Sequence, residues 1–311
     1  MSIALTTKVK RLGYKLADYI GIAPVARLKN APDGHRPTDL LPKAESVISI
    51  GIYMTRGAVI SAHRKDLSGL DIERASNVYK RFAYTLLNVD FLDTAALQIA
   101  RLLEKDGHTA LPVIAPGFAE IVENRPNMIN GPFGPISHRH VAVATGVGEL
   151  GWNGLVINPV VGPRARYTTV ITNAKLEPDP IYHGPKLCEP KKCGFVCANI
   201  CSAQCLSKVK SNSCVIGGRE FHIGKMEHVR CIIYFGLLER QNAGENGEGM
   251  PEDGRQLNLS DYQSHFKEPS YKAWESMAYG WGDHGGLCLL KCPVRMPTIV
   301  KEYLRKWSRQ K

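Results

Sequence analysis

The sequence predicts a mixed α+β fold, and three observations lead to that expectation. The chain has 311 residues, of which 44% are hydrophobic and 22% charged, so it is able to bury a sizeable core. Up to about residue 180, short β-branched runs alternate with segments whose apolar residues recur at helical spacing. From Glu177 the composition changes to Pro, Lys and Cys, which indicates a boundary within 176–186.

The expected elements follow from these patterns in chain order. Helices are expected over 4–20, 73–107 and 141–151, the second ending at Gly107 behind a charged last turn. Strands are expected where apolar β-branched residues run together, over 44–54, 109–116, 154–161 and 167–176. The first domain is therefore placed at 1–180 and the second at 181–311, with an inserted polar, Gly-rich loop near 241–263.

The charge balance points to anionic partners only weakly. The net charge is +11 and the pI about 9.2, which would attract nucleic acid, an acidic cofactor or an acidic redox protein. Apart from the tail 301–311, however, Lys and Arg are scattered, as on an ordinary solvated surface. The first twenty residues show no export signal and no run reaches about 18 apolar residues, so a cytoplasmic protein without a membrane span is expected.

Cysteine is the most informative residue type, because six of the nine cysteines lie within 186–214. In a reducing compartment such a cluster indicates metal or redox ligands rather than disulfides. Cys288 and Cys292 form a C-x3-C-P segment, the closing half of a bacterial ferredoxin run. Zinc is a weaker alternative because the chain has no C-x2-C pair, and buried packing thiols are the remaining one.

Eight ligands would serve two [4Fe–4S] clusters and leave one cysteine over. By the ferredoxin rule, in which the last cysteine of a run crosses to the other cluster, the first cluster would take Cys193, Cys197, Cys201 and Cys292. The second would take Cys205, Cys288 and two of Cys188, Cys214 and Cys231. The steps of three residues depart from the usual steps of two, so a single cluster with unusual ligands stays possible.

Several segments together resemble the corrinoid iron–sulfur superfamily of reductive dehalogenases and epoxyqueuosine reductases. The most specific are "LGWNGL", "GPRAR" with the following "LEPDP", and the two cysteine segments. The resemblance implies a nitroreductase-like α/β core that binds cobalamin and a ferredoxin-like module with two clusters that feeds it electrons. The implied cofactor contacts are Gly151, Trp152, Asn153, Gly154, Arg164 and Arg166.

The sequence also departs from that superfamily. The stretch "FGPISHRH" has no carboxylate where epoxyqueuosine reductases carry a proton-donating aspartate, and the last motif, "HGGLCLLKCP", lacks a third cysteine. A nucleic-acid substrate is therefore not expected, despite the basic charge. Respiratory dehalogenases usually carry a twin-arginine leader, which is not present in the sequence.

A reductive cleavage needs a proton donor beside the bond that breaks. His138 and His140 are the first candidates, because they lie in a Gly/Pro-rich stretch just before a predicted helix, although they would serve equally to cap that helix. Tyr167 and Tyr84 are further candidates for a phenolic donor, or else core aromatics. Arg164 and Arg166 fall on the same side of an extended segment, where they would bind carboxylate, phosphate or amide oxygens.

The leading hypothesis is a cytoplasmic, corrinoid-dependent iron–sulfur oxidoreductase, similar to reductive dehalogenases, that cleaves a small or medium organic substrate reductively. Its electrons would come from a ferredoxin or flavodoxin. One alternative is a ferredoxin-type electron-transfer or reactivation protein that serves a partner corrinoid or flavin enzyme. The other is that the first domain binds a flavin.

Overall fold

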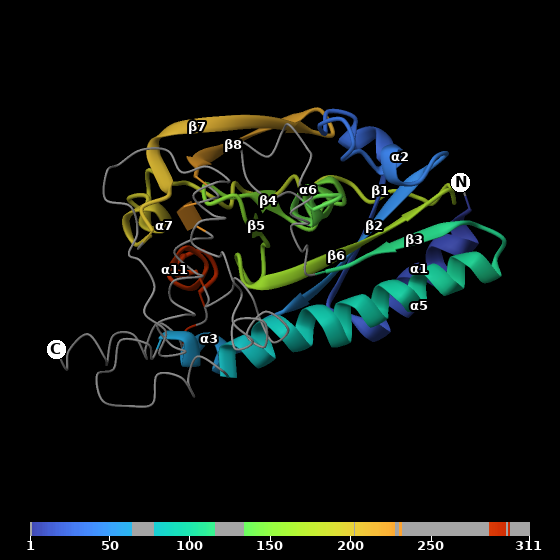
Figure 1. The fold of residues 1–311 in the computed structure, drawn as a ribbon, viewed down its shortest axis with the longest axis horizontal. Helices are drawn as coiled ribbons and strands as arrows, with labels where there is room; N and C mark the ends of the chain where they lie inside the picture. The colour runs from blue at the N-terminus through green and yellow to red at the C-terminus, as the bar shows by residue number, and fades with distance from the viewer. Residues whose placement is uncertain are drawn as a thin grey trace, which may run out of the picture.

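The computed structural model describes residues 2–63, 78–115, 134–201, 203–227, 230–231, 286–296 and 298. Within these ranges it is a mixed helix and sheet structure, as the sequence predicts (Figure 1). The predicted loop near 241–263 and the basic tail lie outside the described residues. None of the described helices has the length and apolar character needed to cross a membrane.

A four-stranded antiparallel sheet forms the centre of the fold, in the order β1-β2-β6-β3. The strands are β1 (Tyr19–Pro24), β2 (Ser46–Tyr53), β6 (Ala165–Thr172) and β3 (Ala110–Val113). The two central strands, β2 and β6, are buried at nearly every position because both faces of the sheet are covered. This explains why their sequences read as continuous apolar and Thr-rich runs rather than alternating ones.

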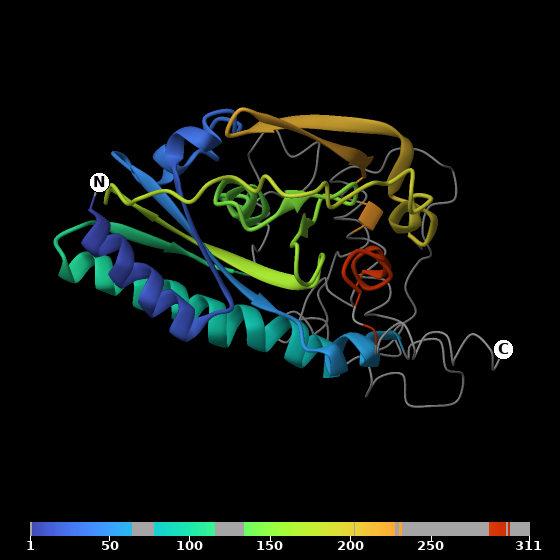
Figure 2. The same ribbon diagram turned by 180° about the vertical axis from the view of Figure 1, so that it is seen from behind.

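Helices cover the two faces of this sheet. Helix α1 (Ile3–Leu16) and helix α5 (Asp93–Lys105) lie side by side against one face, where Val9 and Ile99 pack with Ile48 (Figures 1 and 2). Helix α6 (His138–Ala144) lies on the opposite face and buries Val141 and Val143 against it. The first turn of α6 carries the two histidines that the sequence singles out.

The long helix expected over 73–107 is present in its described part. It runs as a π-helix, η3 (Lys80–Leu92), and continues directly as α5. Gly107 ends it with a φ of +84°, and the next N–H groups turn back, from Gly107 to Glu104 O and from His108 to Leu103 O, each at 3.0 Å. The predicted stop at Gly107 is therefore confirmed, with a glycine in the left-handed conformation that ends many helices.

The remaining elements are short apart from one hairpin. They are η1 (Val25–Leu28), α2 (Pro37–Leu40), α3 (Arg56–His63), β4 (Glu149–Leu150), β5 (Val156–Ile157), α7 (Val196–Asn199), β7 (Leu206–Ile216), β8 (Arg219–Met226) and α11 (Leu287–Leu290).

The helix expected over 141–151 was wrong beyond Ala144. Gly146 adopts a φ of +83°, so the chain turns there and continues as β4, which pairs with β5.

The hairpin β7–β8 was not predicted from the sequence. Its turn is Gly217-Gly218, with φ values of +57° and +82°, the backbone that a tight two-residue hairpin requires. The hairpin extends from the region of α7 toward η1 and α2 (Figure 1). It lies beyond the predicted boundary near residue 180, where Asp179 accepts hydrogen bonds from Ile22 N–H and Lys10 and so ties this connection back to the core.

Gly51 on β2 provides a test of the sheet packing. A Cβ at this position would lie 2.6 Å from the ring of Tyr167 on β6, so the buried ring would have to move. We expect Gly51→Ala to lower the free energy of unfolding by about 1–3 kcal/mol, the usual cost of overpacking, in urea titrations. Gly57→Ala is the control, because nothing lies within 4 Å of its Cβ position. Equal stability of the two variants would contradict this packing.

Candidate functional site

Four cysteines gather beside the turn between β4 and β5. Burial is the main cause that raises the pKa of Cys197 to about 12, and three neighbouring thiols raise it further: Cys188, Cys193 and Cys292. The pKa of Cys188 is raised to about 11, again chiefly by burial, with Cys292 and Cys193 adding to the effect. Such mutual effects place the four thiols in one neighbourhood. We call these four residues the first cysteine group.

Four other cysteines form a second cysteine group. The sulfur atoms of Cys201 and Cys205 are 3.4 Å apart. Their hydrogen bond lowers the pKa of Cys205, but a hydrogen bond with Cys231 and burial outweigh it and raise this pKa to about 12. Burial is also the main cause that raises the pKa of Cys288 to about 12, and three thiols add to it: Cys201, Cys197 and Cys205. Since Cys197 belongs to the first group, the two groups adjoin at Cys288.

This arrangement differs by one cysteine from the partition expected from the sequence. Cys188 occupies the place expected for Cys201, and Cys201 lies instead with the second group. Cys214 is apart from both groups on β7, where burial and Glu220 raise its pKa. All nine cysteines are free thiols. No three His, Cys, Asp or Glu side chains in the described ranges are placed to hold a single metal ion.

The turn between β4 and β5 attaches both groups to the core. The backbone N–H of Trp152 donates to the Cys188 sulfur at 3.3 Å, and the indole N–H donates to Ser207 O at 2.9 Å. The side chain of Asn153 donates to Cys288 O at 3.2 Å. Two residues that the sequence assigns to the cofactor thus bind one cysteine of each group.

The two glycines of the same turn pack against protein. A Cβ on Gly151 would lie 2.8 Å from the side chain of Ile157. Gly154 has a φ of +70°, and its carbonyl accepts a hydrogen bond from Arg139 at 2.9 Å. Both glycines therefore serve the close turn itself.

A buried carboxylate supports the segment that leads to Cys188. Glu149 on β4 accepts the backbone N–H of Leu187 at 2.8 Å and forms an ion pair with Arg219 on β8. The carboxylate is almost fully buried, so breaking this pair would leave an uncompensated charge inside the protein. The pair joins β4, the residue before Cys188 and the hairpin.

The two arginines of "GPRAR" donate to different partners. Arg164 donates to three carbonyl groups of the last cysteine segment, 290–294. Arg166 donates to Ala83 O at 3.1 Å and to the Tyr79 hydroxyl at 3.4 Å, both next to or within η3. Its guanidinium also lies over the ring of Tyr84, 4.9 Å from the ring centre.

Tyr84 and Tyr167 lie on opposite sides of the sheet. Burial raises the pKa of Tyr84, while the adjacent Arg166 lowers it. Tyr167 projects from β6 to the face covered by α6, and burial raises its pKa strongly. Asn158 lies beside the Tyr167 hydroxyl, but no hydrogen bond of normal geometry reaches it. The two phenols therefore cannot serve one pocket together.

Both ring nitrogens of His138 are occupied. Nδ1 lies 2.8 Å from the Thr169 hydroxyl and Nε2 lies 2.8 Å from Ile114 O. A neutral ring that accepts from Thr169 and donates to Ile114 satisfies both contacts. Burial is the main cause that lowers the pKa of His138 to about 4. His138 thus joins α6 to β6 and to the end of β3.

His140 and Arg139 differ from His138, because each has side-chain nitrogen atoms available to bind a further group. Nδ1 of His140 lies 2.6 Å from the Ser137 hydroxyl, while Nε2 has no hydrogen bond among the described residues, and burial is the main cause that lowers the His140 pKa to about 4. Arg139 is exposed to solvent, yet desolvation lowers its pKa, while Cys231 and Cys288 of the second group raise it. Arg139 lies between the two histidines and was not predicted from the sequence as a site residue.

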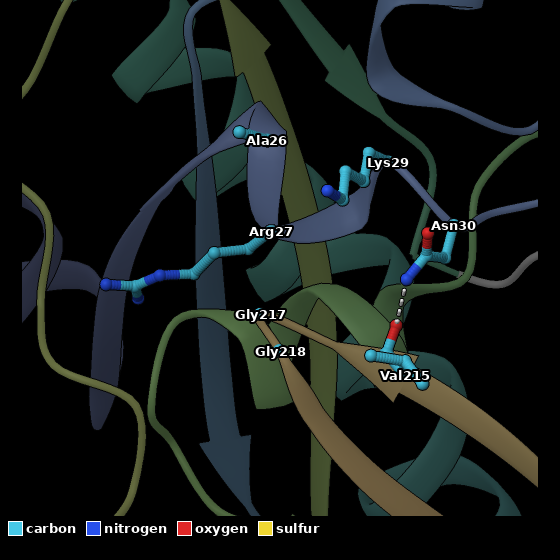
Figure 3. Close-up of a pocket in the computed structure, with 7 residues that line it drawn as sticks. All are labelled: Ala26, Arg27, Lys29, Asn30, Val215, Gly217 and Gly218. Atoms are coloured by element: carbon cyan, nitrogen blue, oxygen red, sulfur yellow. Dashed lines mark hydrogen bonds between the residues drawn. The ribbon is translucent and has the colours of Figure 1, made fainter.

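A separate pocket of about 500 Å³ lies far from these groups, at the turn of the hairpin (Figure 3). Its walls come from η1 and the β7–β8 turn, including Lys29, Val215 and Gly217. The guanidinium of Arg27 extends away from it and donates to Ala144 O and Asp179 O at 2.8 and 2.6 Å.

No protein-family model matches the chain, and the search of curated proteins gave no match. Similar solved structures include an epoxyqueuosine reductase bound to a modified tRNA stem loop, with 16% identity over 92% of this chain and 79% of that one and a TM-score of 0.48. The catabolic reductive dehalogenase NpRdhA matches 91% of this chain and 37% of its own, at 16% identity and a TM-score of 0.49.

A further reductive dehalogenase, described with a mechanism for B12-dependent dehalogenation, matches 91% of this chain and 36% of its own at 16% identity and a TM-score of 0.46. These proteins come from the two groups that the sequence motifs resemble. The match spans most of the reductase but little more than a third of each dehalogenase.

The histidines of α6 predict a loss of stability in acid. Their pKa values of about 4 lie below the ordinary value of 6.5, so between these limits the unfolded chain binds protons that the folded chain does not. Stability should therefore fall as the pH drops from about 6.5 to about 4 and level off below. Urea unfolding of His138→Gln should show a shallower slope in this window, whereas exposed His183→Gln should not. An unchanged slope in His138→Gln would refute this assignment.

Proposed function

We propose that the chain is an iron–sulfur oxidoreductase in which each cysteine group holds one [4Fe–4S] cluster. The observation that carries this proposal is the gathering of eight thiols into two sets of four, drawn from 188–205, Cys231 and 288–292. Four thiolates are the ligand set that each such cluster requires, and nothing but cysteine is needed to complete either set. Eight cysteines in two sets of four match two such clusters in number, and residues 181–311 would form the ferredoxin-like module.

The exchange of one cysteine between the groups follows the ferredoxin rule. Cys292 joins the group built from 188–197, and Cys201, the fourth cysteine of the first run, joins the other group. The sequence predicted that Cys205 would be the crossing cysteine of the first run, whereas in this proposal Cys201 takes that place. This reading leaves Cys214 as the cysteine that binds no cluster.

We propose that electrons enter at the first group and leave from the second. Cys188 and Cys193 are only half-buried, and the exposed Lys191 and Lys192 lie beside them, which suits an acidic donor such as a ferredoxin or flavodoxin. The second group adjoins Arg139 on α6. The contact between the groups at Cys288 gives a short path from one to the other.

We further propose that a corrinoid binds along α6, next to the second group. The resemblance of the sequence motifs supports this cofactor, and the accessible, desolvated guanidinium of Arg139 supports its place, because guanidinium donors suit amide and phosphate oxygens. When bound, the corrinoid would supply the bond-breaking chemistry. The chain would orient it through Arg139 and deliver a proton through His140, whereas His138 would hold the helix in place. Because burial lowers the His140 pKa to about 4, its ring is neutral near pH 7 and would have to take up the proton as the electron arrives.

The alternative of an electron-transfer protein shares the clusters but lacks a corrinoid and a substrate. A third candidate, a flavin in the first domain, would differ in its spectrum. The substrate class in the leading proposal is a small or medium organic molecule that is cleaved reductively. In that proposal the chain itself carries out the cleavage, with electrons from a donor protein, and does not serve a partner enzyme.

Iron and sulfide analysis tests the cluster proposal. We expect about eight iron and eight sulfide per chain in anaerobically purified protein, two clusters of four each. Cys188→Ser should remove the paramagnetic signal of one reduced cluster and Cys201→Ser that of the other, while Cys214→Ser should keep both. About four iron would leave one cluster, and loss of the same signal in Cys188→Ser and Cys201→Ser would refute the partition.

Cobalt content and the absorption spectrum decide between the enzyme and the carrier. We expect the protein to bind cobalamin, and we expect reduced clusters to reduce it. With a substrate found by screening halogenated aromatics, epoxides and nucleosides, His140→Gln should lower turnover by roughly 10²–10⁴-fold with iron and cobalt intact. Iron without cobalt binding would favour the carrier, and a flavin spectrum would favour the third candidate. Full activity in His140→Gln would assign the proton to another residue, such as Tyr167.

A further inference from the structure

Arg164 joins the central sheet to the last cysteine segment. It directly precedes β6 and is only 2% exposed. One terminal nitrogen donates to Val294 O at 3.1 Å, and the other donates to Leu290 O at 3.1 Å and to Cys292 O at 2.5 Å. The planar fork of one guanidinium thus holds the carbonyl groups on both sides of Cys292 and that of Cys292 itself.

The backbone before Arg164 is shaped for this contact. Gly162 has a φ of +64°, and a Cβ there would lie 2.2 Å from Val294 O, so only glycine allows the two segments to approach so closely. The turn that ends at Arg164 and the segment that carries Cys292 therefore pack backbone to backbone. Arg164 acts on a segment that already lies against the sheet.

The charge of Arg164 has no carboxylate partner among the described ion pairs. Its Nε is buried without a hydrogen-bond partner, and its other donors reach only neutral carbonyl groups. A buried cation of this kind is costly unless a negative group compensates it. The Cys292 side chain is one of the groups that act on the Arg164 charge, and it would be negative as a metal-bound thiolate.

We propose that Arg164 is a positioning residue for the first cluster, which fixes Cys292 for ligation and supplies the cluster's buried counter-charge. This inference rests on the proposed clusters and goes beyond them. A cluster gains one negative charge when it accepts an electron, so a fixed cation nearby stabilises the reduced form. Arg164 therefore raises the reduction potential of the first cluster and favours its loading by a donor.

Three variants test the two parts of this role. Arg164→Gln removes the charge, Arg164→Lys keeps the charge but loses the fork, and Arg27→Gln is the matched control. Arg27 likewise donates to two backbone carbonyl groups, but it lies at the other end of the hairpin and faces no cysteine group. The measurements are redox titrations of each cluster by paramagnetic resonance and the rate of iron loss to a chelator.

We expect Arg164→Gln to make the potential of the first cluster more negative and to leave that of the second nearly unchanged. Arg164→Lys should keep the potential closer to wild type but lose iron from the first cluster faster. Arg27→Gln should change neither property. If Arg164→Gln does not load the first cluster at all while Arg27→Gln does, the positioning role is supported, and Arg164→Lys then reports on the charge.

Wild-type potentials and iron retention in both Arg164 variants would overturn the inference. An equal shift in Arg27→Gln would do so too, because it would show a general effect of losing an arginine that holds two backbone carbonyl groups. A wild-type protein that holds no iron and sulfide is a different outcome, which overturns the proposed clusters themselves. The two failures are therefore distinguishable in the same set of samples.

Discussion

The turn between β4 and β5 fixes where the cysteine segments meet. Its Trp152 holds Cys188 through the backbone and Ser207 through the indole, and its Asn153 holds the carbonyl of Cys288. Since these cysteines are 100 residues apart in sequence, neither group would form without a common support on the core. The ring of Trp152, edge-on to Phe195 at 5.3 Å, adds a packing contact to the same support.

Charged side chains around the two cysteine groups form a second constraint on this part of the structure. Glu149 and Arg219 compensate one another, whereas Arg164 and Arg139 face the cysteine groups. Arg164 is deeply buried beside the first group, whereas Arg139 and Arg230, which donates to Ala203 O, lie beside the second. Thiolates bound to iron would balance these cations, and metal binding and folding of this region would then be coupled.

Much of the sheet could be predicted because its strands are marked by uninterrupted apolar runs. The runs 44–54 and 167–176 contain most of β2 and β6, and Gly107 ends its helix as expected. The β7–β8 hairpin was missed, although Gly217-Gly218 between β-rich runs is the signal for such a turn. Its strand β7 is exposed along most of its length, so no apolar alternation draws attention to it.

The cysteine partition could not be read from the sequence, because Cys193, Cys197, Cys201 and Cys205 are evenly spaced. In the structure Cys193 and Cys197 join Cys188, which Trp152 holds, whereas Cys201 and Cys205 lie together, so the four divide two and two between the groups. Arg139 was missed because its neighbours are histidines, the usual proton donors, and the sequence alone does not show that His138 has both nitrogens engaged.

The most direct test of the account is a crystal structure of the anaerobically purified protein with anomalous diffraction measured at the iron edge. The account predicts two separate iron–sulfur centres, one bound by Cys188, Cys193, Cys197 and Cys292 and the other by Cys201, Cys205, Cys231 and Cys288. A single centre, iron bound by Cys201 together with Cys193 and Cys197, or a signal at the zinc edge instead would contradict it.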